Sequence, residues 1–318
     1  MNRTSAYIVA LLALSFAVAS HGQSQRGGPQ FSEWAQLNHL PAPINSVYDD
    51  QAAVLSKDEK TMYFSSNRPG SLAGSLDIWV SSRKNKNSPW HTPVNLGPTI
   101  NSSGKELVRS LTSDGRLLLF QSDRTGGGFG QADIWVITRK QVNDDSGWSE
   151  PINLGGVINT PYTELASNYL FVDSSNVRKL YFSSNKPGGF GGPDIYESTI
   201  TDQGFETSSN VVELNTPSIE TCFWIRDDGL EIIFSSNRPN LFEDRRYDDL
   251  WTATRASVFE TWSAAVNLGP TINTVGYREV APFVTFDGRT LLVSSTRPGG
   301  MAPGTFDMYM TTRRRVKE

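Results

Sequence analysis

The sequence contains few of the residues from which catalytic and metal centres are usually built. Among its 318 residues are one cysteine, Cys222, and three histidines, His21, His39 and His91. A single cysteine excludes an intramolecular disulfide, and so few histidines make a cysteine–histidine nucleophile a poor expectation. We therefore expect Cys222 to be a small core residue, and we expect no resident cofactor.

A strong charge of one sign is also missing. The 29 Lys and Arg residues nearly balance the 33 Asp and Glu residues, which gives a net charge of −4 at pH 7, and the basic residues are scattered. A nucleic-acid-binding surface needs a basic patch or stripe. The composition therefore argues against nucleic acid as a partner.

Only one long apolar run is present, and it lies at the N-terminus. Met1-Asn2-Arg3 gives a positive start, residues 6–19 are almost wholly apolar, and Ser20 follows. This pattern predicts a cleaved signal peptide at 1–20, and the Gly/Gln/Ser-rich stretch 21–30 is expected to be a disordered linker. An uncleaved anchor is the alternative. No cysteine follows the run, so we expect a periplasmic or secreted protein without a lipid anchor or a membrane span.

What the sequence does contain is a repeat of about 56 residues. Each copy has a strand-like run ending in a segment such as Ser65-Ser66-Asn67-Arg68-Pro69-Gly70, and then an Asp followed by an apolar and an aromatic residue. The Asp positions are 77, 133, 194, 249 and 307, so they lie 56, 61, 55 and 58 residues apart. Regular self-similarity at this scale indicates one supersecondary unit per repeat, with neighbouring units burying each other's apolar faces.

The pattern within a repeat predicts four short antiparallel strands. Apolar residues alternate with polar ones, and turns such as Ser113-Asp114-Gly115 and Asp227-Asp228-Gly229 separate the first two runs. Asp-Gly between alternating runs is a strong hairpin signal because glycine tolerates positive φ. Four such strands make a propeller blade, and five repeats predict an all-β, five-bladed β-propeller.

The fourth strand of each blade carries a signature that also predicts how the ring closes. A Trp and an Asn lie 11 positions apart at 90–101, 148–159 and 262–273, and the fifth repeat lacks this segment, whereas residues 34–45 supply it at the other end of the chain. We expect this N-terminal strand to complete the last blade, which removes the exposed sheet edges of an open stack. The expected propeller spans 31–318, with 31–45 as the outer strand of the last blade. The expected blades are 46–101, 102–159, 160–215, 216–273 and 274–318.

The recurring run, from the turn through Ser-Ser-Asn-Arg-Pro-Gly to Asp77-Ile78-Trp79 and its counterparts, resembles the WD-like β-propeller repeats of the TolB type. The resemblance covers about residues 31–318 and implies the propeller fold. Such repeats are common in exported bacterial proteins, where they serve as binding platforms, transport accessories and domains attached to enzymes. TolB itself also has a separate N-terminal domain, for which this chain has no room.

Strand order predicts that an inner ring of acids and a ring of cations share one face. Each acid begins an inner strand and each cation follows a second strand, and both positions open on the same face of a propeller. The acids are Asp50, Glu106, Glu164, Glu220 and Glu279, and the cations are Arg68, Arg124, Lys186, Arg238 and Arg297. Acid and base are expected either to pair structurally within the blades or to bind a ligand. A Ca²⁺-type cation is a further possibility, although no dedicated calcium loop is present.

Residues that depart from the repeat are candidates for an asymmetric binding site. Only blade two places an arginine, Arg109, three residues after its ring acid, and only blade four combines Phe223, Trp224 and Arg226. An aromatic ring beside carboxylates and an arginine suits a sugar or peptide. The alternative is that Trp224 fills space between blades.

These features favour a non-catalytic binding or scaffolding module as the main hypothesis. Its partner is expected to be an envelope or extracellular protein, a peptide or a glycan, and the protein is expected to be a monomer. The alternative hypothesis is a glycoside hydrolase. Five-bladed arabinanase-like propellers place catalytic carboxylates at the starts of inner strands, and the ring acids occupy comparable positions, although those enzymes' local motifs are missing.

Overall fold

The computed structural model describes residues 29–142, 144–172, 177–239 and 247–316. The predicted signal peptide at 1–20 and all but the last two residues of the predicted linker lie outside the described residues.

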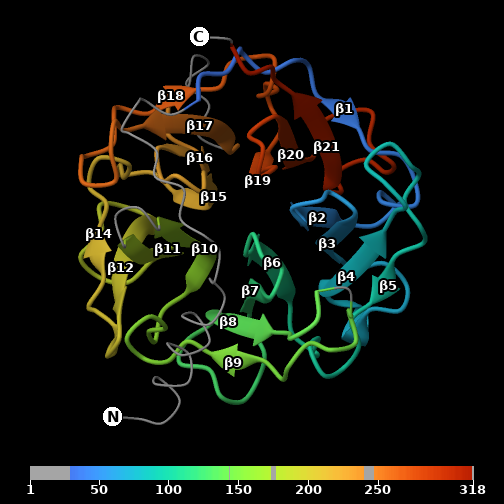
Figure 1. Ribbon diagram of the computed structural model, residues 1–318, viewed down its shortest axis with the longest axis horizontal. Helices are drawn as coiled ribbons and strands as arrows, with labels where there is room; N and C mark the ends of the chain where they lie inside the picture. Colours follow the sequence, from blue (N-terminus) through green and yellow to red (C-terminus); the bar gives the residue numbers. More distant parts are fainter. Residues whose placement is uncertain (1–28, 143, 173–176, 240–246, 317–318) are drawn as a thin grey trace.

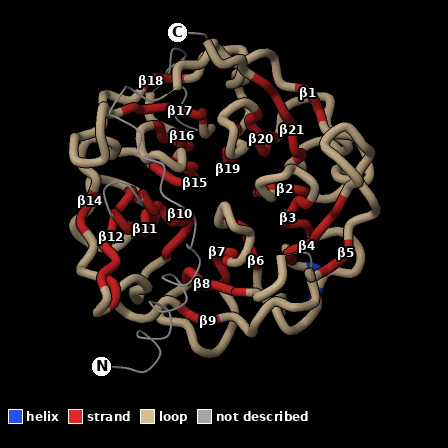
Figure 2. The backbone as a smooth tube through the Cα atoms, viewed as in Figure 1, coloured by secondary structure: helices blue, strands red, loops and turns tan. Residues whose placement is uncertain are grey.

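Five four-stranded antiparallel blades surround a common axis, as predicted from the repeat (Figure 1). Strands and loops make up nearly all of the described chain, with one short 3-10 helix at Leu72–Gly74 (Figure 2). Blade 1 contains β2 (Asp50–Leu55), β3 (Thr61–Ser66), β4 (Asp77–Ser82) and β5 (Val94–Asn95). Blade 2 contains β6 (Glu106–Leu111), β7 (Leu117–Ser122), β8 (Asp133–Thr138) and β9 (Ile152–Asn153).

The remaining blades follow the same order from the inside outward. Blade 3 contains β10 (Glu164–Val172), β11 (Val177–Ser184), β12 (Asp194–Thr201) and β14 (Ser209–Asn210), and β13 (Gly204–Phe205) pairs with the end of β12. Blade 4 contains β15 (Glu220–Ile225), β16 (Glu231–Ser236), β17 (Asp249–Thr254) and β18 (Val266–Asn267). Blade 5 contains β19 (Glu279–Val284), β20 (Thr290–Ser295), β21 (Asp307–Thr312) and β1 (Asn38–His39).

The N-terminal segment closes the ring, which confirms the prediction from the displaced Trp–Asn signature. Asn38 pairs with Met310 and His39 with Tyr309, and the first and last strands lie side by side in Figure 1. Trp34 is buried against blade 5. Because β1 covers the outer edge of β21, the last blade has the same four strands as the others.

Apolar side chains from adjacent blades form the core. Side chains of the second strands pack between neighbouring blades, so residues such as Tyr63, Phe120, Phe182 and Phe234 are fully buried. Burying each large side chain contributes about 1.5–3 kcal/mol to stability. The interior is therefore a filled core between sheets.

An arginine–tryptophan stack on the face away from the ring acids explains the repeated Trp. In four blades an arginine after the third strand lies over the Trp of the outer-strand segment. The pairs are Arg83–Trp90, Arg139–Trp148, Arg255–Trp262 and Arg313–Trp34, with 4.2–4.4 Å between the guanidinium carbon and the ring centroid. Each arginine also donates from Nε to a carbonyl in the first hairpin turn of its own blade, so the stack joins the outer strand to the hairpin turn.

Every inner strand contains a register shift against its neighbour. In β6 the shift lies between Val108 and Ser110, which places Arg109 in the irregular segment. Ala52, Cys222 and Ala281 adopt positive φ in the corresponding segments of their strands. Bulges redirect side chains. At these positions near the axis, successive side chains therefore no longer alternate regularly between the two faces of the sheet. No helix of the described residues is long and apolar enough to cross a membrane.

Candidate functional site

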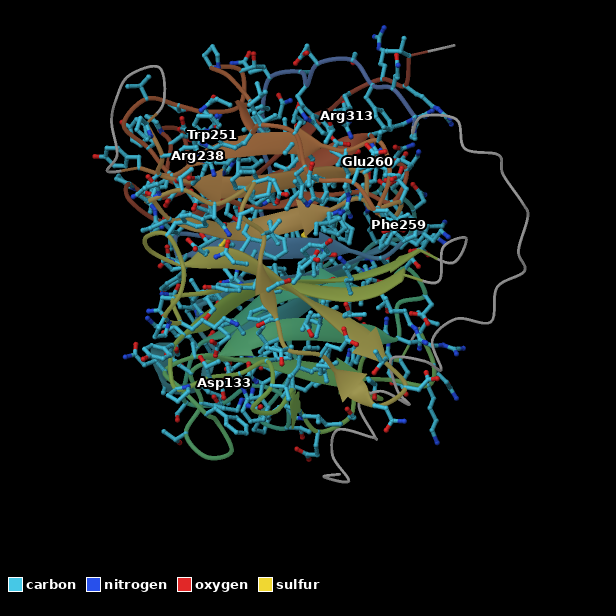
Figure 3. All side chains as sticks on the ribbon, turned by 90° about the vertical axis from the view of Figure 1, so that its left-hand side faces the viewer. Asp133, Arg238, Trp251, Phe259, Glu260 and Arg313 are labelled. Atoms are coloured by element: carbon cyan, nitrogen blue, oxygen red, sulfur yellow. The ribbon has the colours of Figure 1, made fainter. Side chains whose placement is uncertain are left out.

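The five ring acids lie at the first position of the five inner strands. The structure thus places them at equivalent positions in the blades, as predicted, but the side chains of Asp50, Glu106, Glu164, Glu220 and Glu279 are all 0% exposed. Viewed from the side, Arg238 and Asp133 lie toward one face of the propeller, and Phe259 and Glu260 lie toward the other (Figure 3). The ring acids belong to the face of Arg238, since Arg238 and Glu220 are paired.

Each carboxylate joins two parts of the chain that the fold brings together. Glu220, for example, accepts from the Thr216 amide at 2.9 Å and hydroxyl at 2.7 Å, on the loop from blade 3, and from the Ser236 hydroxyl at 2.9 Å, at the end of β16. Asp50, Glu106, Glu164 and Glu279 accept the corresponding loop amide. The acid therefore holds the loop between blades to the inner strand.

Four of the five cations form salt bridges with the acid of their own blade. The distances from Arg Nη2 to Glu Oε1 are 3.2 Å for Arg124–Glu106, 3.1 Å for Arg238–Glu220 and 2.9 Å for Arg297–Glu279, and Arg68 pairs with Asp50. The same guanidinium also donates to a carbonyl just before the loop, such as that of Leu214 for Arg238. This geometry gives these four acids a structural role, and their predicted role as ligand contacts stays a prediction.

Blade 3 departs from this arrangement. Among the described residues, Glu164 is the one ring acid without a salt bridge. Lys186 stands in the place of the arginine; its ammonium donates to the Ser208 hydroxyl and lies 4.1 Å from the centroid of the Tyr196 ring. Glu164 still accepts from the Thr160 amide at 2.7 Å, the Thr160 hydroxyl at 2.6 Å and the Ser184 hydroxyl at 2.7 Å.

Burial raises the pKa of two ring acids. For Glu164, desolvation is the dominant cause; hydrogen bonds from Thr160 and Ser184 oppose it, and the charge of Asp133 adds to it. For Glu279, desolvation again raises the pKa, but the charge of Arg297 is the largest opposing cause. A buried carboxyl without a salt bridge favours its protonated form, and Glu164 combines a raised pKa with the absence of a salt bridge among the described residues.

The three unrepeated residues predicted to bind a ligand do not come together. Trp224 is 6% exposed and packs in the core with Ile233 and Phe283, which is the alternative considered for it. Arg226 follows the last residue of β15, about 20 Å along the strand from Glu220, and donates to Asp228 and Glu231. Arg109 lies in the bulge of β6 and contacts Gln121 and Cys222.

Sequence reasoning missed two partners of Arg109. Gln121 stands where the other blades have the first serine of the Ser-Ser pair, such as Ser65, and this single departure was the available signal. Cys222 was expected to be a core residue, but it is only partly buried. Its proximity to Arg109 could not be predicted, because residues 113 positions apart meet only through closure of the ring.

The described residues contain no group of three or more His, Cys, Asp or Glu side chains that could hold a metal ion. In blades 1, 2, 3 and 5 the buried Asp at the start of the third strand accepts from a loop amide. Asp133, for instance, accepts from the amides of Phe129 and Gly130 and from the Asn153 side chain. These four aspartates thus anchor the loops of their own blades.

No protein-family model matches this sequence, and no curated protein is significantly similar to it. Several solved structures share the fold. An α-L-arabinofuranosidase from Podospora anserina in complex with cellotriose is 11% identical, with a TM-score of 0.53, and the match covers 90% of this chain and 98% of that one. The catalytic domain of a GH62 α-L-arabinofuranosidase from Coprinopsis cinerea is 10% identical, with a TM-score of 0.54 and the same coverage.

A putative TolB from Agrobacterium tumefaciens is 12% identical, with a TM-score of 0.46, and the match covers 89% of this chain and 99% of that one. This likeness is too low to carry an argument. The five-bladed fold is confirmed, and the assignment of the repeats to the TolB type stays a prediction.

The main functional hypothesis from the sequence is corrected by these comparisons. A non-catalytic binding or scaffolding module was expected, whereas similar five-bladed structures are glycoside hydrolases. The physical reason for the error is that the repeat pattern reports blade construction, which catalytic and non-catalytic propellers share. At this identity the likeness establishes the fold alone.

Proposed function

We propose that this protein is a glycoside hydrolase and that Glu164 is its proton donor. The main observation behind this proposal is that burial raises the pKa of Glu164 and that this residue has no salt bridge among the described residues. A general acid must keep its proton until the glycosidic oxygen takes it, and glycosidases achieve this by raising the pKa of one carboxyl group. The glycoside hydrolases that share the fold support this choice of reaction.

The proposed step is balanced by one water molecule. Glu164 gives its proton to the glycosidic oxygen as the bond from that oxygen to the anomeric carbon breaks. Water then supplies a hydroxyl group to the anomeric carbon and a proton to the enzyme, which restores the acid. Because Glu164 is 0% exposed, the proposed step requires the substrate to open the contacts that cover its carboxyl, including that of the Thr160 hydroxyl, which donates to Oε1 at 2.6 Å.

The experiment compares two glutamates in equivalent positions. Glu164→Gln and Glu220→Gln each remove a carboxylate that accepts from a loop threonine and a second-strand serine. Release of sugar from aryl α-L-arabinofuranosides and from arabinose-bearing polysaccharides is measured, because the similar structures include α-L-arabinofuranosidases. We expect Glu164→Gln to lower kcat by about 10²- to 10⁴-fold, the usual contribution of general acid catalysis, and Glu220→Gln to retain activity while folded.

The dependence of the rate on the leaving group distinguishes a proton donor from a residue with a purely structural role. An acidic phenol needs little proton donation, so Glu164→Gln should lose much less activity on a dinitrophenyl glycoside than on an alkyl glycoside. Absence of hydrolysis by the wild-type protein, or equal losses in the two variants, would contradict the proposal.

We also propose that the protein acts after export, in the periplasm or outside the cell, on the basis of the N-terminal signal pattern. Cell fractionation tests this placement. Recovery of uncleaved protein in the cytoplasmic fraction would overturn it.

A further inference from the structure

Arg109 reaches across the axis of the propeller. It extends from β6 in blade 2, and its Nη1 atom lies 3.5 Å from the Sγ atom of Cys222, in β15 of blade 4. These two blades are not neighbours in the ring (Figure 1). Both residues are partly exposed.

The guanidinium of Arg109 has no counter-charge among the described residues. Its Nη2 atom donates to the neutral Gln121 Oε1 at 2.6 Å, and its Nε–H is buried without a hydrogen-bond partner. Arg238 is the contrast, because its charge is matched by Glu220. A desolvated donor without an acceptor is costly, and a carboxylate would satisfy both the charge and the free donor.

None of the other residues that stand three positions after a ring acid is charged. The positions equivalent to Arg109, three residues after the ring acid, are Ala53, Ser167, Phe223 and Pro282. Arg109 lies three residues after Glu106, the ring acid of its own blade. One arginine fork, with its planar donor geometry, matches a single carboxylate better than a dispersed negative charge.

We propose that Arg109 binds the carboxylate of an acidic sugar, so that the substrates of this protein are glycans bearing uronic acids. That the bound glycan is a substrate rests on the proposed function. That a carboxylate binds at this place rests on Arg109, Gln121 and Cys222. Arg109 is here a specificity residue that selects a negatively charged sugar over a neutral one.

The single cysteine of the chain provides a direct test of binding. A carboxylate bound to Arg109 should shield Cys222 from a neutral alkylating reagent such as iodoacetamide. The rate of alkylation is measured by mass spectrometry with glucuronate, galacturonate, the corresponding neutral sugars, and a short acidic peptide. We expect the two uronates to slow alkylation of the wild-type protein and the neutral sugars and the peptide to have no effect.

Two variants of blade 2 serve as test and matched control. Arg109→Gln removes the guanidinium and should weaken uronate binding about tenfold or more, as expected for a lost charge-assisted hydrogen bond. Arg116→Gln removes the same charge from an exposed position beyond the far end of β6 and should leave protection unchanged. Calorimetric titration with glucuronate repeats the comparison without the thiol, and thermal unfolding verifies that both variants are folded.

The outcomes separate this inference from the proposed function. Protection by uronates that depends on Arg109 supports the inference even if no glycoside is hydrolysed, in which case only the proposed function fails. Equal protection by neutral sugars, protection by the peptide alone, absence of protection, or protection that survives Arg109→Gln would overturn it. Hydrolysis of neutral glycosides without uronate protection would leave the proposed function standing and remove this inference.

Discussion

Blades 3 and 4 place the same glutamate at the same position and surround it differently. Glu164 and Glu220 both accept from a threonine of the preceding loop and a serine of the second strand. Glu220 is paired with Arg238, whereas the ammonium of Lys186 binds Ser208. The comparison indicates that the hydrogen bonds common to both blades hold the loop to the inner strand. Whether the carboxylate is also paired with a positive charge depends on which cation the blade carries.

The chemistry of the two cations explains this difference. A guanidinium has several donors in one plane, and Arg238 uses them on Ser236, Leu214 and Glu220 together. An ammonium is a compact point charge on a flexible chain. A lysine at this position therefore need not bridge the loop, the strand and the acid, and Glu164 is left with neutral donors.

The largest effect is expected from removing the two cations separately. Arg238→Leu leaves the Glu220 carboxylate buried without its partner and should cost about 3–5 kcal/mol in the free energy of unfolding. Lys186→Leu breaks no salt bridge with Glu164 and should cost about 1 kcal/mol. Urea unfolding followed by circular dichroism measures both. Equal costs would break the contrast between the blades.

Exchanging the two cations should give each blade the stability and the carboxyl–cation pairing of the other. Lys186→Arg introduces the guanidinium found in the other four blades and should stabilise the protein by about 1.5–3 kcal/mol, as a hydrogen bond to a charged group does. The new cation also favours the ionised form of Glu164 and thus lowers its pKa, so the proposed hydrolase should lose activity as it gains stability. Arg238→Lys is the reciprocal variant and should lose stability. A Lys186→Arg protein that is both more stable and fully active would contradict the role given to Glu164.

Most of the fold could be predicted from the sequence because its signals are repeated. Five phased copies of the Ser-Ser-Asn-Arg-Pro-Gly run fixed the number of blades, and the Trp34–Asn45 segment revealed how the ring closes. The register shifts in the inner strands and the additional strand β13 were not predicted. Both depend on local backbone geometry that side-chain alternation does not report.

The smallest predicted effect concerns the pH dependence of stability. Because the folded-state pKa of Glu164 is raised above its ordinary value of 4.5, the folded protein holds this proton more tightly than the unfolded chain. The contribution of Glu164 is therefore most favourable below pH 4.5 and is lost as the pH rises through the folded-state pKa. Glu164→Gln should remove this part of the pH dependence and leave the parts from Glu279 and Asp77. Urea titrations of both proteins across this range measure the difference, and identical profiles would contradict the raised pKa.

The candidate site could be predicted only in part. Strand order correctly brought acids and cations to one face, but it could not reveal that the carboxyls are closed from solvent, because burial depends on the packing of loops from two blades. Conversely, Trp224 and Arg226 stood out in the sequence, but Trp224 is buried in the core and Arg226 lies at the end of β15 far from Glu220. Arg109 was singled out as unrepeated, while its contact with Cys222 required the closed ring.

The most direct test of the account is the protonation state of Glu164 itself. Carbon-13 NMR of protein labelled at the glutamate carboxyl groups, recorded as a function of pH, assigns the resonance of Glu164 by its loss in Glu164→Gln. The account predicts that this resonance titrates above the ordinary value of 4.5 and that Lys186→Arg moves its midpoint downward. A midpoint at or below the ordinary value, unchanged by Lys186→Arg, would contradict the central claim that burial without an arginine partner raises the pKa of Glu164.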